Sequence, residues 1–356
     1  METCKIYFVA LAAIWMAFAT SASPIKKCKP VSGTFVVDQQ DLYPESSDWD
    51  PIHCKLYAGA LYNSTVLVYD PITLEKKIIS FPDVSGKPEY HVSGIDVDTR
   101  SGSVYIGTSS GTPFGSGGRN LTGPNHLVRY DTRSERVLWS ADLAGFQEQV
   151  VKTTGKMVSG FQDQAEDLQG NSYMLASFGN AIARISRDGK DVSVFYAPGL
   201  NEAFPLGFGG IFSLRNTLVV SDNREQAFYV FDAKDKMGKP KIVKPEGSPK
   251  DYVFTCDGLI APSKYKGTVA LCANNRGVPA PGGIAVYQSK DSWATAQWKG
   301  LILNDDPAVV GGRATTTVEI TGSIFINTIF GRSATNPRSS FPYVDITSKV
   351  QALLTS

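Results

Sequence analysis

The stretch FQDQAEDLQGNSYMLASFGNAIARISRDGKDVSVF, residues 161–195, contains three short apolar runs. These runs are separated by Asp-Leu-Gln-Gly-Asn, Gly-Asn and Arg-Asp-Gly-Lys, which carry the Asp, Asn and Gly residues that tight turns favour. The pattern predicts short antiparallel strands joined by hairpins. Whether it is a local meander or one copy of a repeat decides the fold.

The same pattern recurs along the chain. A strand of small residues leads through a polar turn to a second strand rich in Tyr, Val and Ile. A third strand ends near Tyr-Asp or Phe-Asp, and a fourth follows. With the opening stretch, the copies that begin near residues 55, 94, 210, 258 and 316 make six units. Their spacing of roughly 40–55 residues is that of propeller blades.

We therefore predict an all-β fold, a six-bladed β-propeller that forms a single domain over residues 23–356. The strand GTFVVDQQ, residues 33–40, belongs to none of the six units and is expected to close the ring by pairing with the last blade. Such a radial stack leaves only short, protected sheet edges. No long helical pattern competes. A many-stranded β-sandwich, or a ring of five or seven blades, is the alternative.

The N-terminus predicts the secretory route. Residues 6–20 are almost wholly apolar, follow a lysine and lead into Ser21-Ala22-Ser23-Pro24, which is the layout of a signal peptide. An apolar run of about fifteen residues is too short to span a bilayer comfortably. We expect residues 1–22 to be the signal peptide and the protein to be secreted or held in the cell wall, with no transmembrane span. An uncleaved anchor is the alternative.

Four cysteines remain after such a cleavage, and an even number favours disulfides in a secreted chain. Three pairings are possible, and the local one joins Cys28 to Cys54 and Cys256 to Cys272.

Two Asn-X-Ser/Thr sequons predict N-glycosylation, at Asn63 and Asn120. The net charge of +1 gives no strong field that would attract nucleic acid. We expect a monomer without a nucleic-acid partner.

A propeller site commonly lies at one mouth of the central channel, beside the innermost strand of each blade. Chemically capable residues precede several of these strands: His91, Gln162, Asp163, Asp257 and Arg313. His91 suits general acid or base work. Asp163 or Asp257, desolvated in an apolar channel, is able to hold a proton and donate it to an epoxide or ether oxygen. These three are the candidate catalytic residues. The alternative is that each satisfies backbone groups at a strand start.

The candidate ligand-binding residues are Gln162, Arg313, Phe208 and Asn274. Phe208 belongs to a set of aromatic residues near strand ends, which suits a pocket for an apolar small molecule such as a terpenoid or lipid. Packing between blades is the alternative for the aromatic residues. No cofactor is expected.

A second ring of polar residues follows the second strands, at Asp222-Asn223, Asn274-Asn275 and Asn327-Thr328. Their oxygens suit a calcium ion, and residues 218–232 are similar to a strand pair of calcium lactonase propellers. The Glu-Gly-Pro start and the Asn-Asp pair of those lactonases are absent, and turn formation explains the residues more simply. We expect no metal site and keep a calcium-dependent hydrolase as an alternative.

Several segments resemble one known family. Residues 137–156 and 161–195, the start at 49–71 and the tail at 331–346 are similar to the secreted fungal propellers typified by the major Malassezia allergen. The trichothecene-cluster accessory protein of Fusarium and Trichoderma belongs to the same group. The resemblance implies a six-bladed propeller, secretion or wall association, and fungal origin. For the toxin-cluster branch it implies a role in mycotoxin biosynthesis or virulence, including ring closure on an epoxide-bearing terpenoid.

Two function classes follow. The first is an enzyme or cyclase-like factor of a secondary-metabolite pathway, with His91, Asp163 or Asp257 in acid–base roles. The second is a secreted binding or wall protein without turnover. A buried carboxyl group with a raised pKa beside His91 would favour the first. A channel plugged by apolar side chains would favour the second.

Overall fold

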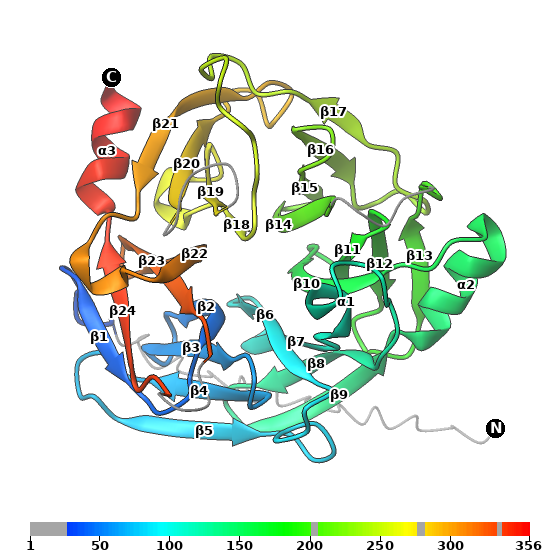
Figure 1. The fold of residues 1–356 in the computed structure, drawn as a ribbon, viewed down its shortest axis with the longest axis horizontal. Coiled ribbons are helices and arrows are strands. Elements are labelled where there is room, and N and C mark those ends of the chain that lie inside the picture. Colours follow the sequence, from blue (N-terminus) through cyan, green and yellow to red (C-terminus); the bar gives the residue numbers. More distant parts are fainter. Residues whose placement is uncertain (1–26, 201–205, 276–281, 333–336) are drawn as a thin grey trace, which may run out of the picture.

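The six units form six four-stranded antiparallel sheets around a central axis in the computed structural model (Figure 1). The structure describes residues 27–200, 206–275, 282–332 and 337–356. The expected signal peptide, residues 1–22, lies outside these residues. The predicted six-bladed propeller is confirmed.

The first three blades have the following strands. Blade 1 comprises β2 (Pro44–Asp50), β3 (Lys55–Ala60), β4 (Thr65–Tyr69) and β5 (Lys76–Ser80). Blade 2 comprises β6 (His91–Asp98), β7 (Ser103–Ser109), β8 (Asn125–Asp131) and β9 (Arg136–Asp142). Blade 3, the opening stretch, comprises β10 (Ser159–Glu166), β11 (Ser172–Phe178), β12 (Ala181–Ile185) and β13 (Val192–Tyr196).

The remaining blades follow the same order. Blade 4 comprises β14 (Phe208–Leu214), β15 (Thr217–Asp222), β16 (Ala227–Asp232) and β17 (Lys241–Val243). Blade 5 comprises β18 (Leu259–Ile260), β19 (Val269–Asn274), β20 (Gly283–Gln288) and β21 (Gln297–Leu303). Blade 6 comprises β22 (Gly312–Ile320), β23 (Ser323–Phe330), β24 (Ser340–Asp345) and β1 (Phe35–Asp38).

The N-terminal strand closes the ring, as expected. β1 pairs antiparallel with β24, with Phe35 opposite Tyr343. The two rings stack with their centroids 5.0 Å apart. Val37 of the same strand is fully buried, whereas its neighbour Val36 is 42% exposed. The last blade is therefore built from both ends of the chain, which joins the ring by hydrogen bonds and by a shared apolar layer.

Apolar side chains fill the spaces between neighbouring blades. Tyr173 and Phe195 of blade 3 pack edge to face with a centroid distance of 4.9 Å. Phe195 contacts Phe231 of blade 4 at 5.6 Å. Large aromatic side chains bury much area at low cost in conformational freedom, so such contacts dominate the packing energy between sheets.

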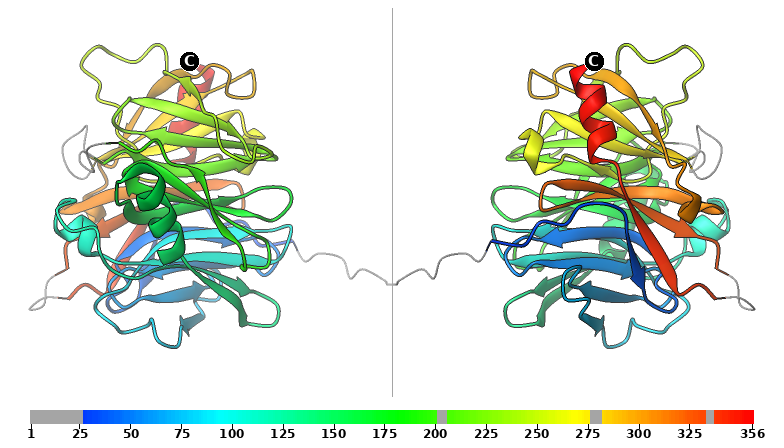
Figure 2. Two further views of the ribbon diagram at one scale, coloured as in Figure 1. Left: turned by 90° about the vertical axis from the view of Figure 1, so that its right-hand side faces the viewer. Right: turned by 90° about the vertical axis from the view of Figure 1, so that its left-hand side faces the viewer.

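The structure corrects the expectation that no helix competes with the strands. α2 (Ala144–Thr154) connects blades 2 and 3, and α3 (Thr347–Thr355) follows the last strand; both lie on the outer rim (Figures 1 and 2). The spacing of Phe146 and Val150, both fully buried, is that of one helix face. One short apolar face between two strands is a weak signal in a chain dominated by strands.

Both disulfides follow the local pairing, Cys28 with Cys54 and Cys256 with Cys272. Within the described part of the chain, no helix is long and apolar enough to cross a membrane.

The inner strand of each of five blades carries a register shift, a β-bulge. In β6 the shift lies between Val92 and Ile95, and in β10 it lies between Phe161 and Gln164. The same irregularity occurs in β2, β14 and β22. A bulge re-aims the neighbouring side chains and is common next to functional sites.

Candidate functional site

The inner strands enclose a cavity of about 1120 Å³ in the central channel. Residues from all six blades line it, and most belong to the bulges and to the strand segments that follow them. Its walls include apolar side chains such as Ile95, Ile211 and Leu259. A cavity of this size, partly apolar and open at the channel, is suited to a small-molecule ligand.

Acidic groups outnumber basic ones among the residues that line this cavity. Eight lining residues are acidic: Glu45, Asp48, Asp96, Asp98, Asp163, Glu166, Asp257 and Glu319. Three are basic: Lys27, Arg100 and Arg215. Carboxyl groups gathered in a partly apolar space repel one another when ionised, so some of them keep their protons.

Asp163, a candidate from the sequence, lines the cavity. Burial holds the pKa of its carboxyl group well above the usual range, and Asp96 and Asp257 add repulsion. Its two oxygens accept hydrogen bonds from the backbone N–H groups of Ile211 at 3.0 Å and Gln164 at 3.1 Å. These two bonds favour the ionised form and oppose the effect of burial.

Gln162, also expected in the site, lines the cavity beside Asp163. Its side-chain amide donates to the carbonyl of Gly209 in blade 4 at 2.7 Å. The bulge of β10 therefore bridges blades 3 and 4 through two neighbouring side chains.

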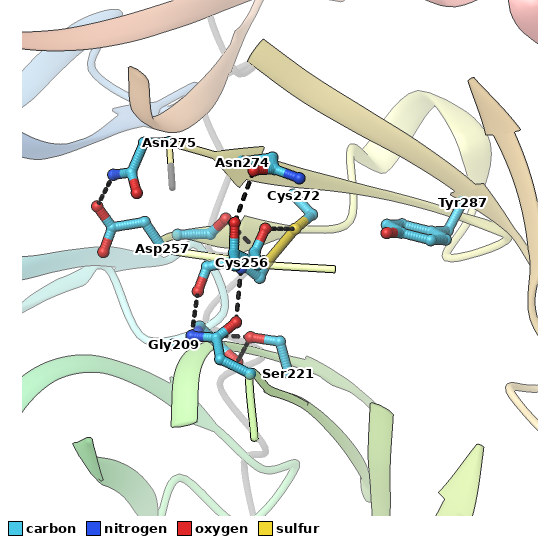
Figure 3. Close-up of a disulfide and its surroundings, with 12 residues drawn as sticks. Gly209, Ser221, Cys256, Asp257, Cys272, Asn274, Asn275 and Tyr287 are labelled. Atoms are coloured by element: carbon cyan, nitrogen blue, oxygen red, sulfur yellow. Dashed lines mark hydrogen bonds between the residues drawn. A yellow bond between two sulfur atoms is a disulfide. The ribbon is translucent and has the colours of Figure 1, made fainter. Parts of the chain in front are cut away.

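Asp257 lies in the cavity wall just before β18, next to a disulfide (Figure 3). Its carboxylate accepts a hydrogen bond from the side-chain amide of Asn275 at 2.5 Å. The preceding residue is Cys256, whose disulfide to Cys272 fixes this segment to β19. A Cβ atom at Gly209 would collide with the carbonyl of Cys256, so glycine is required where blade 4 approaches this segment.

Asp48 and Asp96, which were not among the candidates, occupy equivalent positions in blades 1 and 2. Asp48 lies opposite Tyr57 and Asp96 opposite Tyr105 in their sheets. Burial, with repulsion from Asp96, raises the pKa of Asp48 to about 8. Burial also raises the pKa of Asp96. One oxygen of Asp48 accepts the backbone N–H of Val97 in the next blade at 2.7 Å.

Glu166 is the most deeply buried of these carboxyl groups, with 1% of its surface exposed. Burial and repulsion from Asp96 hold its pKa well above the usual range. Neither of its carboxyl oxygens has a hydrogen-bond partner among the described residues. This residue too was missed from the sequence.

A repeated signal was available for Asp48 and Asp96. Both begin an Asp-X-Asp sequence, Asp48-Trp49-Asp50 and Asp96-Val97-Asp98. The second Asp of each closes the following turn, because it accepts a backbone N–H two residues later, at 2.7 Å from Ile52 and 3.1 Å from Arg100. The first Asp of each sequence, Asp48 or Asp96, takes no part in this turn and lines the channel cavity.

The structure does not bring His91 and Arg313 to this cavity. Each stands at or near the first position of its inner strand, whereas the lining begins at Ser93 and Thr315. The ring of His91 packs edge to face on Tyr62 with a centroid distance of 5.4 Å. Burial and nearby Arg332 lower the pKa of His91. A carboxyl group with a raised pKa beside His91 would have favoured the enzyme class, and burial and Arg332, not a carboxyl group, are what shift the pKa of His91 in the described part of the chain.

Phe208 and Asn274 belong to the packed interior. Phe208 is fully buried and contacts Tyr229 with a ring distance of 5.5 Å. Asn274 is also fully buried, accepts from the Thr255 hydroxyl at 2.6 Å and donates to the Val253 carbonyl at 2.9 Å. Both match the packing alternative better than a contact with the main cavity.

The polar residues after the second strands hold the blades together. Asp222 accepts from the side-chain amide of Asn180 at 2.9 Å, and Asn223 donates to the Cys256 carbonyl at 3.1 Å. Within the described ranges, no group of three or more His, Cys, Asp or Glu side chains is arranged to hold a metal ion.

Comparison with known proteins places the chain in a family. The family model described as "Mal s 1 allergenic protein-like" matches residues 22–300. The chain belongs to this family. It is 27% identical over 344 residues to trichothecene biosynthesis protein 14 of Trichoderma arundinaceum, covering 92% of each chain. It is 26% identical to the major allergen Mal f 1 of Malassezia furfur over 74% of this chain and 76% of the allergen.

A second trichothecene-cluster relative is the core cluster protein 14 of Fusarium sporotrichioides, 27% identical over 96% of this chain and 92% of its own length. Among solved structures, the Malassezia sympodialis allergen Mala s 1 superposes with a TM-score of 0.76 at 22% identity, over 89% of this chain and 96% of the allergen. A luciferin-regenerating enzyme matches with a TM-score of 0.53 at 12% identity, over 88% and 95%. These two likenesses concern the fold alone.

Two disulfides and allergen relatives are consistent with an extracellular protein. Of the two expected glycosylation sites, Asn120 is exposed and Asn63 is half-buried.

Proposed function

We propose that this protein is a secreted, monomeric fungal propeller that binds an apolar, oxygen-bearing small molecule, such as a terpenoid, in the channel cavity. It acts there in the biosynthesis of a trichothecene-like secondary metabolite, or in virulence through that metabolite. The two trichothecene-cluster relatives, aligned over more than nine-tenths of this chain, support the pathway. The cavity supports the ligand class.

The observation that carries an enzymatic role is the set of carboxyl groups with raised pKa values in that cavity. The pKa of Asp48 is about 8, and burial holds that of Asp163 well above the usual range. A carboxyl group that is still protonated near neutral pH is able to act as a general acid. This supports acid chemistry without any cofactor.

The reaction that fits is the opening of an epoxide with closure of a new ring. A cavity carboxyl group gives its proton to the epoxide oxygen as the ring C–O bond breaks. A hydroxyl oxygen of the same molecule attacks the epoxide carbon whose C–O bond breaks. The proton of this hydroxyl group then returns to the carboxylate. The product is an isomer of the substrate, so no oxidant or reductant is needed.

A specific observation favours the second class, a secreted binding protein without turnover. Asp48 and Asp163 each accept a backbone N–H from the next blade, at 2.7 Å and 3.0 Å, and so connect neighbouring sheets. In that case their carboxyl groups hold the ring together, and the cavity binds a lipid-like ligand unchanged.

Metabolite profiling of the wild-type fungus and a deletion strain separates the two classes. We expect an intermediate to accumulate in the deletion strain and purified protein to convert it. Identical profiles would leave the non-catalytic binding role.

The purified variant Asp163→Asn tests the contribution of the first candidate. If Asp163 is the general acid, conversion should fall by about 10²- to 10⁴-fold, while the fold, followed by circular dichroism, is retained. Asp188→Asn, an exposed carboxylate on the blade surface, is the matched control and should convert at the wild-type rate. Equal rates for all three proteins would remove Asp163 from the mechanism.

A further inference from the structure

The cavity wall contains a pair of carboxyl groups, Asp96 and Glu166, to which the proposed function gives no role. Glu166 ends β10 of blade 3, and Asp96 lies in β6 of blade 2. Both line the cavity. The two carboxyl groups lie close enough to share a hydrogen bond when one of them holds a proton, and repulsion from Asp96 is the largest charge effect on Glu166.

The surroundings of Glu166 offer its anion little other support. The Ser172 hydroxyl favours the anion, but no described donor makes a hydrogen bond of normal geometry to either carboxyl oxygen, although 99% of the residue is out of contact with water. An ionised carboxylate without donors is costly to bury. Asp163 differs, because two backbone N–H groups stabilise its anion. A proton on either Glu166 or Asp96 allows a hydrogen bond between the two carboxyl groups, which no other described residue provides to the Glu166 carboxyl group in normal geometry.

The charged neighbours do not neutralise the pair. The groups that face it are Asp98 at the end of β6, Arg100 in the turn after it, Tyr105 of β7, Asp48 of β2 and Asp163 of β10. Arg100 is the cation among these, and its guanidinium Nε is bound to Asp98 at 2.7 Å. Its terminal nitrogen reaches the backbone carbonyl of Glu166 at 3.4 Å, not the carboxyl group.

We propose that Asp96 and Glu166 share one proton and form the acid of this cavity, which donates to a neutral ether or epoxide oxygen of the bound molecule. When the ligand oxygen takes the proton, two facing carboxylates remain. Their repulsion drives the return of a proton from the attacking hydroxyl group. The ligand class is a neutral oxygen acceptor, because an anion would meet the surplus of acidic groups. This inference rests on the proposed acid chemistry and assigns its proton donor.

Infrared spectroscopy of the purified protein tests the shared proton without any substrate. We expect a C=O stretching band of a neutral carboxyl group at pH 7, and both Asp96→Asn and Glu166→Gln should shift or remove that same band. Asp188→Asn, an exposed carboxylate, should leave it unchanged. A wild-type spectrum without such a band overturns the proposal, and this readout does not depend on the folding of any variant. Asp48 and Asp163 should give bands of their own, so the proposal is also overturned if every such band disappears in Asp48→Asn or Asp163→Asn and none changes in Asp96→Asn or Glu166→Gln.

An epoxide reagent, 1,2-epoxy-3-(4-nitrophenoxy)propane, tests the donor and the acceptor class together. The protonated carboxyl group gives its proton to the epoxide oxygen while the partner carboxylate attacks a ring carbon. The ring C–O bond breaks, an ester C–O bond forms, and a hydroxy ester remains. Peptide mass spectrometry should locate it on Asp96 or Glu166, with labelling slowed roughly a hundredfold in Asp96→Asn and Glu166→Gln. Labelling confined to other carboxyl groups, or no labelling by excess reagent, overturns the assignment.

The pathway role and the shared proton are refuted by different results. A shared proton with unchanged metabolite profiles would refute the pathway role and leave the pair as an acid of another reaction. Conversion that survives Asp96→Asn and Glu166→Gln would keep the enzyme and refute the pair.

Discussion

Asp48 illustrates how one carboxyl group serves both the fold and the cavity. Its oxygens accept the backbone N–H groups of Trp49 at 2.8 Å and of Val97 in the next blade at 2.7 Å. These bonds favour the anion, yet burial and repulsion from Asp96 still raise its pKa to about 8. The enclosure of the channel therefore outweighs two hydrogen bonds, which explains why this group keeps its proton near neutral pH.

Asp48→Asn should change how stability depends on pH. In the unfolded chain the pKa of Asp48 is about 3.9, whereas in the folded protein it is about 8. Between these values the unfolded chain loses this proton first, so its ionisation lowers the free energy of unfolding as the pH rises. We expect the stability of the wild type relative to Asp48→Asn to fall by a few kcal/mol between pH 4 and pH 8, measured by urea unfolding.

The control for this measurement is Asp188→Asn. Asp188 is fully exposed and its pKa is lowered by hydrogen bonds from Ser186 and Lys190, so its titration ends below pH 5. The difference between the wild type and this variant should be constant from pH 5 to pH 8. A constant difference for Asp48→Asn as well would contradict the raised pKa.

At the scale of single residues, the sequence predicted the cavity only in part. Asp163, Asp257 and Gln162 were expected and do line it. His91 and Arg313 were predicted to line the site because each precedes a strand. Which side chains reach the channel depends instead on the direction in which each bulge points them. Bulges leave no clear mark in a single sequence, so this step required the structure.

At the scale of elements, the innermost strand of blade 1 was the one not predicted. Its sequence, PESSDWD, has no run of apolar residues, so the repeat pattern places the start of this blade at β3. Polar residues are tolerated there because they bond across blades, as Ser47 does with the side chain of Asn327 at 2.9 Å. A strand whose neighbours satisfy its polar groups need not carry the alternating pattern of a half-buried strand.

Ring closure by β1 gives a prediction with a matched control on the same strand. Val37 is fully buried opposite Phe341, whereas Val36 is 42% exposed. Val37→Asp places an unpaired charge in an apolar layer and should lower the free energy of unfolding by about 3 kcal/mol or more. Val36→Asp should change it by about 0.5 kcal/mol at most. Denaturant unfolding checks both, and equal losses would show that β1 does not close the ring in solution.

At the scale of the whole molecule, the fold was predictable because the repeat is visible in the sequence and a ring of blades is the simple way to bury it. The cavity was less predictable, because it is assembled from residues far apart in the chain. Asp48 and Glu319, which both line it, are separated by most of the sequence. The repeated blade pattern thus determines the fold. The side chains of the inner strands, which differ from blade to blade, determine the chemistry of the channel.

The channel cavity should be the ligand site of the molecule, and filling it should abolish binding without unfolding the ring. Ser213 lines the cavity from β14, whereas Ser193 of β13 is exposed on the outer edge of blade 3. The neutral apolar probe N-phenyl-1-naphthylamine should bind the wild type with saturable fluorescence. Ser213→Trp puts an indole in the cavity and should weaken binding by about tenfold or more. Ser193→Trp should bind as the wild type does, and if Ser213→Trp binds equally well, the ligand site lies outside the channel.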